Sequence, residues 1–544
     1  MSNSATSLLS VDNLTVDFHS ATGAFRATEE VSFSVEAGET LVILGESGSG
    51  KSVSASAIMG LIDTPPGEIV SGTVQYRGRD ITHLSEGARR SINGCKIAMI
   101  FQDPLSHLNP VYTIGWQMAE VYTAHKKAGS AEARQRSIDI LRRVGIPEPE
   151  TRIDWYPHQF SGGQRQRIMI GMAIALGPEL LIADEPTTAL DVSVQAQILD
   201  LLKDLQREEG LGIIMITHDL EVAANMADRI VVMKNGRIVE EGDARKVFDH
   251  PEHAYTRQLM GALPAHIEAP ERAAGTEPIL AVEHLCKSYQ LSPGLFGAPR
   301  VLNAVDDVSF TLKRGETLGI VGESGSGKST IARILLRLTD ATSGAALFHG
   351  DDVLKMDRQQ LLAFRRRVQM VFQDPYSSMN PRMDVFSIVS ESWRIHKDIL
   401  ARVQWRDRVA ELLALVGLNA DHAKRYPHQF SGGQRQRIAI ARALACDPEL
   451  LVCDEAVSAL DVSIQMQIID LLGDLRDRLG LSYIFITHDL PIVRNFADRI
   501  LVMKSGKVVE QNRTEALFQN PADPYTRKLI EAAPRPKWEN ATAA

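Results

Sequence analysis

A long internal repeat constrains what this 544-residue chain can fold into. The eight residues from Gly45 to Ser52 recur unchanged from Gly322 to Ser329, and the thirteen from Tyr156 to Ile168 recur from Tyr426 to Ile438. Self-similarity on this scale marks duplicated structural units. We therefore expect two copies of one domain, one in each half of the chain.

The boundary between the copies is expected in residues 261–278, which are rich in Ala, Glu and Pro and lack apolar periodicity. Such a segment is typical of a linker. The first domain then covers residues 1–260 and the second residues 279–544, and each ends in a tail of its own. The length is compatible with two large domains.

Composition narrows the class of protein further. Hydrophobic residues make up 44% and charged residues 23%, as in soluble globular proteins. The formal net charge of -9 has the wrong sign for a protein that binds nucleic acid by bulk electrostatics, so no nucleic-acid partner is expected. The chain has no signal-peptide pattern, no apolar run long enough for a membrane span and no Cys-x-x-Cys pair, which favours the reducing cytoplasm. The four cysteines are Cys95, Cys286, Cys446 and Cys453.

The repeated octapeptide reads Gly-x-x-x-x-Gly-Lys-Ser and follows an apolar run at 40–44. Strand, glycine-rich turn and helix (52–62) in this order form the phosphate-binding P-loop, whose backbone N–H groups and helix N-terminus favour anions. Its lysine reaches the β and γ phosphates of a nucleotide, and its final serine ligates Mg²⁺. The predicted residues are Gly45, Glu46, Ser47, Gly48, Ser49, Gly50, Lys51 and Ser52, then Gly322, Glu323, Ser324, Gly325, Ser326, Gly327, Lys328 and Ser329.

An acidic pair follows a second apolar run in each half. Asp184 and Glu185 come directly after 180–183, and Asp454 and Glu455 occupy the same place in the repeat. A carboxylate at the end of a strand downstream of a P-loop is where such folds hold the Mg²⁺ side of the nucleotide. Asp184 and Asp454 are therefore predicted metal-side ligands.

The segments Ser161-Gly-Gly-Gln164 and Ser431-Gly-Gly-Gln434 resemble the signature motif of ATP-binding cassette (ABC) ATPases. The resemblance spans nearly the whole chain and includes the motifs of that family in order. It implies an α/β fold of two P-loop NTPase domains in tandem, each with a RecA-like core and a helical subdomain. ATP and Mg²⁺ are the implied cofactors.

By the same likeness, further residues take family roles. Gln102 and Gln373 match the Q-loop, which senses Mg²⁺ and relays closure to a partner, and Asp191 and Asp461 match the D-loop. His218 and His488 match the switch histidine that holds the attacking water and the γ-phosphate, and Glu185 and Glu455 match the group that polarises this water. Phe18 and Tyr289 resemble the aromatic residue that stacks on adenine, although an aromatic residue in a short strand is often a core residue.

The family mechanism places each ATP between the P-loop of one half and the signature loop of the other. Ser431 and Gly433 would complete the site of Lys51, and Ser161 and Gly163 the site of Lys328. Both sites are expected to hydrolyse ATP. The second half has Ala456-Val457-Ser458 where the first has Pro186-Thr187-Thr188, so rate or geometry is expected to differ between the sites.

The tails indicate which ABC protein the chain resembles. Residues 250–257 and 520–527 resemble the His-Pro-Tyr-Thr segment of ATPases from the dipeptide, oligopeptide, glutathione and nickel importer group, with Ala254 replacing the proline in one tail and Asp523 the histidine in the other. The likeness implies two separate permease subunits, an extracytoplasmic substrate-binding protein and a peripheral position on the cytoplasmic face of the inner membrane. The tails lack cysteine, so no iron-sulfur cluster is expected.

The transported molecule stays open at this point. Dipeptides or short oligopeptides come first, followed by glutathione, peptide antibiotics and nickel. The rival class is a soluble double-cassette ATPase that acts on ribosomes or DNA. Its relatives have long charged linkers, zinc-binding cysteine clusters or coiled coils, none of which the sequence shows.

Overall fold

The computed structural model describes residues 7–20, 23–188, 190–261, 277–291, 300–374, 376–458 and 460–532. Residue contacts divide the chain into two compact units, with the division after residue 263. Residues 262–276, most of the predicted linker, lie outside the described part, so the domain bounds 1–260 and 279–544 remain a prediction. Each unit is described by itself.

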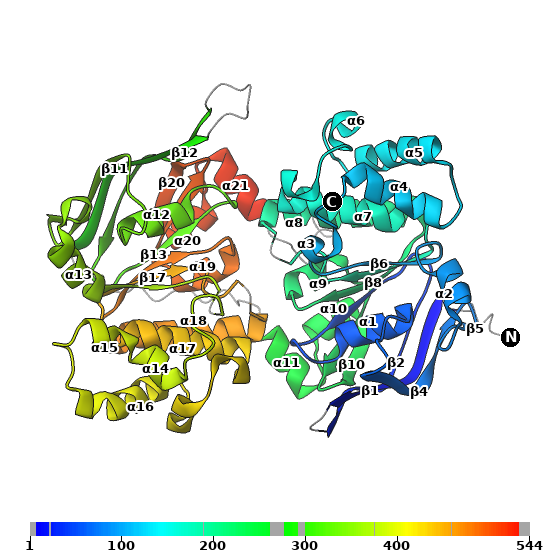
Figure 1. Ribbon diagram of the computed structural model, residues 1–544, viewed down its shortest axis with the longest axis horizontal. Helices are drawn as coiled ribbons and strands as arrows, with labels where there is room; N and C mark the ends of the chain where they lie inside the picture. Colours follow the sequence, from blue (N-terminus) through cyan, green and yellow to red (C-terminus); the bar gives the residue numbers. More distant parts are fainter. Residues whose placement is uncertain are drawn as a thin grey trace. The chain divides into compact units, whose positions relative to one another are not determined.

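The first unit combines two sheets with flanking helices (Figure 1). Its strands are β1 (Leu9–Ser20), β2 (Gly23–Val35), β3 (Thr40–Leu44), β4 (Gly67–Tyr76), β5 (Arg79–Asp80), β6 (Ile97–Ile100), β7 (Leu180–Asp184), β8 (Gly212–Thr217), β9 (Arg229–Lys234) and β10 (Arg237–Asp243). Its α-helices are α1 (Lys51–Met59), α2 (Glu86–Ile92), α3 (Pro104–His107), α4 (Ile114–Ala124), α5 (Ser130–Arg143), α6 (Pro149–Arg152), α7 (Gly162–Ile174), α8 (Val192–Glu209), α9 (Leu220–Met226), α10 (Ala244–Asp249) and α11 (Ala254–Met260).

The larger sheet has the order β10-β9-β3-β8-β7-β6 and is parallel except for the β9–β10 pair. Strands β3, β7 and β8 are buried throughout and consist of continuous apolar runs, as strands covered on both faces should. The predicted strands at 40–44 and 180–183 are thereby confirmed. Asn235 and Gly236, both with positive φ, form the tight turn between β9 and β10.

The smaller sheet has the order β2-β1-β4-β5 and is antiparallel. Its apolar face and the larger sheet share one core with α1, in which Leu14, Ile43, Ile58 and Val231 are at most 1% exposed. The core therefore fixes α1, which begins at the P-loop, between the two sheets. A separate helical segment, α4 to α7, joins β6 to β7, and in it α4, α5 and α7 pack against one another (Figure 1).

The second unit repeats this architecture. Its strands are β11 (Pro278–Leu291), β12 (Arg300–Lys313), β13 (Thr317–Val321), β14 (Ser343–Phe348), β15 (Asp351–Asp352), β16 (Val368–Val371), β17 (Leu450–Asp454), β18 (Ser482–Ile486), β19 (Arg499–Lys504) and β20 (Lys507–Arg513). Its α-helices are α12 (Lys328–Leu335), α13 (Arg358–Arg367), α14 (Val385–Val389), α15 (Glu391–Ile395), α16 (Trp405–Leu415), α17 (Gly432–Leu444), α18 (Val462–Leu479), α19 (Leu490–Phe496), α20 (Thr514–Gln519) and α21 (Pro524–Glu531).

The sheets of the second unit have the orders β16-β17-β18-β13-β19-β20 and β12-β11-β14-β15, the same as in the first. Helix α16 buries Val409, Leu412 and Leu413 completely. Gly417 follows it with φ +74°, as a glycine after a helix C-terminus should. Both units therefore have the predicted α/β fold with a RecA-like core and a helical subdomain.

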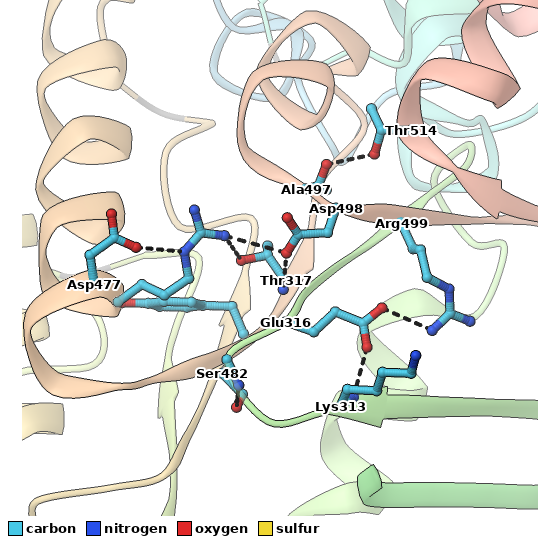
Figure 2. A network of polar contacts seen from close by, with 12 residues as sticks. Lys313, Glu316, Thr317, Asp477, Ser482, Ala497, Asp498, Arg499 and Thr514 are labelled. Carbon is cyan, nitrogen blue, oxygen red and sulfur yellow. Dashed lines mark hydrogen bonds and ion pairs between the residues drawn. The ribbon is translucent and has the colours of Figure 1, made fainter. Parts of the chain in front are cut away.

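A polar network lies at the N-terminal ends of the parallel strands in the second unit's larger sheet (Figure 2). Asp498 accepts the backbone N–H of Thr317 at 2.8 Å, and the buried Arg476 of α18 donates to the Thr317 hydroxyl at 2.7 Å. Arg476 lies 3.5 Å from the Asp498 carboxylate. In the first unit Gln206 takes the arginine's place and donates to Thr40 at 2.8 Å.

Among the described residues, the helices are all too short or too polar to cross a membrane.

Candidate functional site

The P-loop of each unit requires glycine at its first position. Gly45 has φ +154°, and a Cβ atom placed on it would lie 2.3 Å from the carbonyl oxygen of Met233 in β9. Gly322 has φ +151°, and its Cβ would lie 2.2 Å from the carbonyl oxygen of Met503. Since a backbone oxygen cannot move aside like a side chain, the close approach of the neighbouring strand excludes any other residue here.

The P-loop lysines are buried and ordered. Lys51 is 5% exposed and donates from Nζ to the carbonyl oxygens of Gly45 at 2.6 Å and Glu46 at 2.8 Å. Lys328 makes the same bonds to Gly322 at 2.6 Å and Glu323 at 2.9 Å. A buried ammonium group held by the loop is positioned to meet phosphate oxygens at the N-terminus of the following helix.

The last P-loop serine and the first strand-end carboxylate lie side by side. Ser52 donates to Oδ1 of Asp184 at 3.1 Å, and Ser329 to Oδ1 of Asp454 at 2.8 Å. The pairing of β3, β8 and β7 brings α1 and the end of β7 to one edge of the sheet. Burial raises the pKa of both aspartates, against the hydrogen bonds from the serines.

These oxygens suit a hard divalent cation. Mg²⁺ is commonly held by one or two carboxylates, hydroxyl groups and the phosphates of the nucleotide. Within the described ranges, no group of three or more His, Cys, Asp or Glu side chains could hold a metal by itself. The residues therefore fit a cation that shares its ligands with phosphate.

Glu185 stands at the centre of the first site. Its φ of +47° is unusual for a residue with a side chain, and its N–H bonds to the carbonyl of Ile216 at 2.9 Å. The carboxylate accepts hydrogen bonds from Gln102 at 2.6 Å and from the Thr188 hydroxyl at 2.8 Å, and it lies 3.0 Å from Nδ1 of His218. Burial opposes its ionisation, but His218 and Thr188 outweigh burial and lower the pKa of Glu185 to about 2.

The second site keeps this arrangement with two differences. Gln373 donates to Glu455 at 2.6 Å, but Nδ1 of His488 lies 3.6 Å from the Glu455 carboxylate. The Ser458 hydroxyl bonds the backbone carbonyl of Glu455 at 3.0 Å and not its carboxylate. His488 still lowers the pKa of Glu455, and burial opposes it. One of these two differences, at Thr188 and Ser458, therefore lies in the segment that also differs in sequence.

The signature serines begin helices. Ser161 caps α7, since its hydroxyl accepts the N–H of Gln164 at 3.3 Å while the Gln164 side chain accepts the N–H of Ser161 at 3.2 Å. The same reciprocal pair joins Ser431 and Gln434 at the start of α17. Both serines are exposed.

Close packing against a neighbouring helix requires glycine at two positions of the signature segments, Gly163 and Gly433. A Cβ on Gly163 would lie 2.3 Å from a methyl group of Val194 in α8, and one on Gly433 would lie 2.4 Å from Ile464 in α18. These contacts explain why glycine stands there within each unit. The predicted contact of Ser161, Gly163, Ser431 and Gly433 with ATP stays a prediction.

The two predicted adenine-stacking rings have different surroundings. Phe18 in β1 is half-buried and packs at the margin of the core. Tyr289 in β11 is 38% exposed, with the Lys287 ammonium group 4.9 Å from its ring centroid. The surroundings of Phe18 favour a structural role, and stacking on adenine remains a prediction for both.

The sequence analysis did not identify two kinds of residue that contact the site: Thr188 and the tail tyrosines. Thr188 was quoted only as part of a sequence difference, yet its hydroxyl contacts the Glu185 carboxylate. The tail tyrosines served only to indicate a family, yet the Tyr255 hydroxyl bonds the backbone of Glu46 in the P-loop at 3.2 Å. The repetition of Tyr-Thr-Arg at 255–257 and 525–527 could have marked the tyrosines as residues of interest, but it does not indicate their partner in the loop.

Together, the parallel sheet, the glycine-rich loop with its buried lysine, and the serine–aspartate pair define a P-loop nucleoside triphosphatase. Residues 28–188 and 305–458 match the family described as ABC transporter, and residues 239–286 and 509–543 match the oligopeptide/dipeptide transporter C-terminal region. The chain belongs to the ABC transporter family, as an ATP-binding, ATP-hydrolysing protein with two cassettes and importer-type tails.

Full-length relatives share this layout. The glutathione import ATP-binding protein GsiA of Escherichia coli (strain K12) is 45% identical over 566 residues, which cover 97% of this chain and 90% of the relative. The peptidoglycan transport ATP-binding protein YejF of Agrobacterium fabrum is 46% identical over 529 residues, which cover 97% and 96%. Both matches include the two cassettes in one chain.

Proposed function

We propose that this chain powers the import of short peptides across the inner membrane through two separate permease subunits, with an extracytoplasmic binding protein that delivers the substrate. The observation that carries the proposal is the pair of tails, one per unit, that match the oligopeptide/dipeptide transporter region. The names of its relatives point to glutathione and peptidoglycan. Glutathione, peptide antibiotics and nickel are the alternative cargoes, and the chain acts at the cytoplasmic face of the membrane.

Purification of the tagged chain from membranes tests this role. Two integral permeases should copurify, and a peptide-loaded binding protein should stimulate hydrolysis of ATP by the complex. A panel of dipeptides, glutathione and nickel then identifies the cargo. Copurification of ribosomes or DNA-repair proteins without a permease would favour the soluble double-cassette class and overturn the importer role.

A groove in the second unit supports a permease partner. It has a volume of about 680 Å³ and lies beside the Q-loop, with Phe372, Arg442 and Ile395 in its lining. Phe372 is 39% and Ile395 61% exposed, so apolar surface adjoins the residue that contacts Glu455. If the apolar end of a permease helix binds here, its movement would displace the loop that contains Gln373.

The groove has its own test. Ile395→Glu should abolish copurification of the permeases while the chain retains basal ATPase activity, because the charge lies in the contact and outside the nucleotide site. Val403, which is 86% exposed and outside the groove lining, provides the matched control Val403→Glu, which should keep both. Equal copurification of the two variants would rule out this docking surface.

The proposed ATP sites are composite. The P-loop of each unit binds the phosphates, and the exposed serine and N-terminus of α7 or α17 from the other unit complete the site, since a thirteen-residue helix favours an anion at its N-terminus. Ser431 and Gly433 pair with the Lys51 site, and Ser161 and Gly163 with the Lys328 site. Lys51→Ala should therefore impair the site that Ser431 completes, and unchanged nucleotide occupancy there would contradict the assignment.

Glu185 and Glu455 are the proposed general bases. A carboxylate with a lowered pKa is ionised at neutral pH and can orient and polarise a water molecule for attack on the γ-phosphate. His218 and His488 lie beside these carboxylates and hold the water and the γ-phosphate. Gln102 and Gln373 link the base to the loop that follows β6 or β16.

Mg²⁺ is the proposed metal. Ser52, Asp184 and Gln102 would hold it in the first site, and Ser329, Asp454 and Gln373 in the second. When bound, the ion neutralises charge on the β and γ phosphates. The chain's own contribution is to hold Ser52 next to Asp184 and to keep the aspartate buried.

A further inference from the structure

The tails contain a feature that hydrolysis and family membership leave unexplained. Tyr255 in α11 and Tyr525 in α21 place their hydroxyl oxygens 3.2 Å from the backbone nitrogens of Glu46 and Glu323. A backbone N–H can only donate, so each phenol oxygen is the acceptor. These glutamates follow the first glycine of each P-loop, and 209 and 202 residues separate the partners in sequence.

Glu46 is also one of the two residues whose carbonyl groups hold the P-loop lysine. Its carbonyl accepts hydrogen bonds from Nζ of Lys51 at 2.8 Å and from the N–H of Ser49 at 3.2 Å. Glu323 accepts the same bonds from Lys328 at 2.9 Å and Ser326 at 3.1 Å. One residue of the loop is thus bound to the tail through its N–H and to the lysine through its carbonyl.

The tail holds the tyrosine firmly. Glu240 in β10 accepts the N–H groups of Glu252 at 2.8 Å and His253 at 2.9 Å, which fixes the turn before α11. Nδ1 of His253 accepts the N–H of Tyr255 at 3.2 Å. The Tyr255 side chain is buried, and the Lys234 ammonium group lies 4.3 Å from its ring centroid.

The second tail reaches the same result with different residues. Glu510 accepts the N–H groups of Ala522 at 2.9 Å and Asp523 at 3.0 Å, and Asp523 accepts the N–H of Tyr525 at 2.7 Å. Asp523 therefore replaces His253 as the acceptor that begins the helix. The side chain before the tyrosine differs between the tails, whereas the tyrosine hydroxyl and its partner are kept.

The hairpin that carries the tail supports the loop from a second side. The N–H of Gly236, in the turn between β9 and β10, donates to the carbonyl of Ser49 at 3.1 Å, and Gly506 donates to Ser326 at 3.0 Å. The hairpin turn and the tail tyrosine together fix both ends of the P-loop segment from Glu46 to Ser49.

We propose that Tyr255 and Tyr525 are positioning residues of the ATP sites, which hold the P-loop backbone and, through it, the phosphate-binding lysine in place. The tail of each unit then stabilises the P-loop of the nucleotide site on the same unit. Loss of the tyrosine hydroxyl loosens the loop and weakens ATP binding without a change in the groups that touch ATP.

Removal of the hydroxyl alone tests this inference. In the full chain, Tyr255→Phe and Tyr525→Phe together should raise the KM for ATP about two- to tenfold, the equivalent of one hydrogen bond per site. The rate at saturating ATP should change less, and the thermal unfolding midpoint should stay close to wild type. Tyr122→Phe, at a tyrosine buried in α4, is the matched control and should leave KM unchanged.

Hydrogen exchange of the loops separates positioning from a general structural role. Without nucleotide, Tyr255→Phe should speed amide exchange in residues 45–50 and leave 322–327 unchanged, and Tyr525→Phe should do the reverse. Unchanged KM and unchanged loop exchange in the folded variants would overturn the proposal. A lower unfolding midpoint with unchanged KM would overturn it too, because the bond would then serve only the fold.

Discussion

The amide group of Gln102 donates a hydrogen bond to Oε2 of Glu185 across 2.6 Å. Gln102 follows β6 and Glu185 follows β7, so the bond joins the ends of neighbouring strands. The loop that follows Gln102 leads into the helical segment of the unit. A displacement of this loop therefore changes the orientation of the proposed base.

Replacement of both proposed bases should stop turnover but not binding. Glu185→Gln with Glu455→Gln keeps the shape of each side chain but removes the carboxylate, so hydrolysis should fall at least about a hundredfold. The doubly substituted chain should retain two ATP molecules, measured by nucleotide content after gel filtration. Substantial residual hydrolysis would refute the assignment of both glutamates.

The two sites should respond differently to loss of one hydroxyl group. In a Glu455→Gln background, Thr188→Ala should lower turnover at the first site about two- to tenfold, because the Glu185 carboxylate loses a hydrogen bond. In a Glu185→Gln background, Ser458→Ala should have a smaller effect, since Ser458 bonds only the backbone of Glu455. Steady-state rates at saturating ATP measure both, and equal losses would show that the asymmetry has no catalytic consequence.

The buried arginine of the second unit should be replaceable by the residue that the first unit uses. Arg476→Gln should alter stability by no more than about 1 kcal/mol, because the charge that it removes is costly to bury and Gln206 makes the equivalent bond to Thr40. Asp498→Ala should destabilise the unit by about 3 kcal/mol, since it removes the carboxylate that accepts the Thr317 N–H and one of the two carboxylates beside the buried guanidinium group. Thermal unfolding measures both variants, and a larger loss for Arg476→Gln would contradict this expectation.

Acid should weaken the fold through Glu179. The hydrogen bonds from Lys96 and Arg77 lower the pKa of this carboxyl from 4.5 to about 2, although burial opposes them. Because the pKa of Glu179 is lower in the folded protein than in the unfolded chain, its ionised form stabilises the fold at pH values above 4.5. This stabilisation is lost as the pH falls from 4.5 toward 2. Glu179→Gln should therefore lower the unfolding midpoint at pH 7, with a gap that narrows below pH 4.5.

Glu208→Gln is the matched control for this prediction. Glu208 pairs with Arg143, and its side chain is 62% exposed, so its loss should change little at any pH. A constant gap between Glu179→Gln and wild type across the acid range would show that Glu179 contributes through packing and not through its charge.

The sequence was informative wherever a local pattern determines a local structure. The structure adopts the conformation that each local pattern favours. The apolar run at Thr40–Leu44 is a strand, the P-loop glycines Gly45, Gly48 and Gly50 have positive φ, and Asn235-Gly236 forms a tight turn. Contacts between distant segments were harder to predict. Nothing in the spacing of Tyr255 and Glu46 indicates that the tail lies on the loop, because their proximity depends on how β9 and β10 lie beside β3.

The effect of the residue differences between the two halves could also be understood only from the structure. His253 and Asp523 differ in charge and shape, yet both accept the N–H of the following tyrosine. Conversely, Thr188 and Ser458 both carry a hydroxyl group but direct it to different atoms. Chemical similarity of two residues in a repeat therefore did not predict whether their contacts are the same.

The buried lysine of the P-loop has a consequence for the conformational entropy that ligand binding must overcome. Lysine is among the side chains that lose the most rotamer freedom when ordered. In Lys51 the loop's own carbonyl oxygens impose that order, so folding and not nucleotide capture bears the entropic cost. In the proposed complex, the phosphate oxygens of the nucleotide would replace the two carbonyl oxygens as acceptors of an ammonium group that is already ordered.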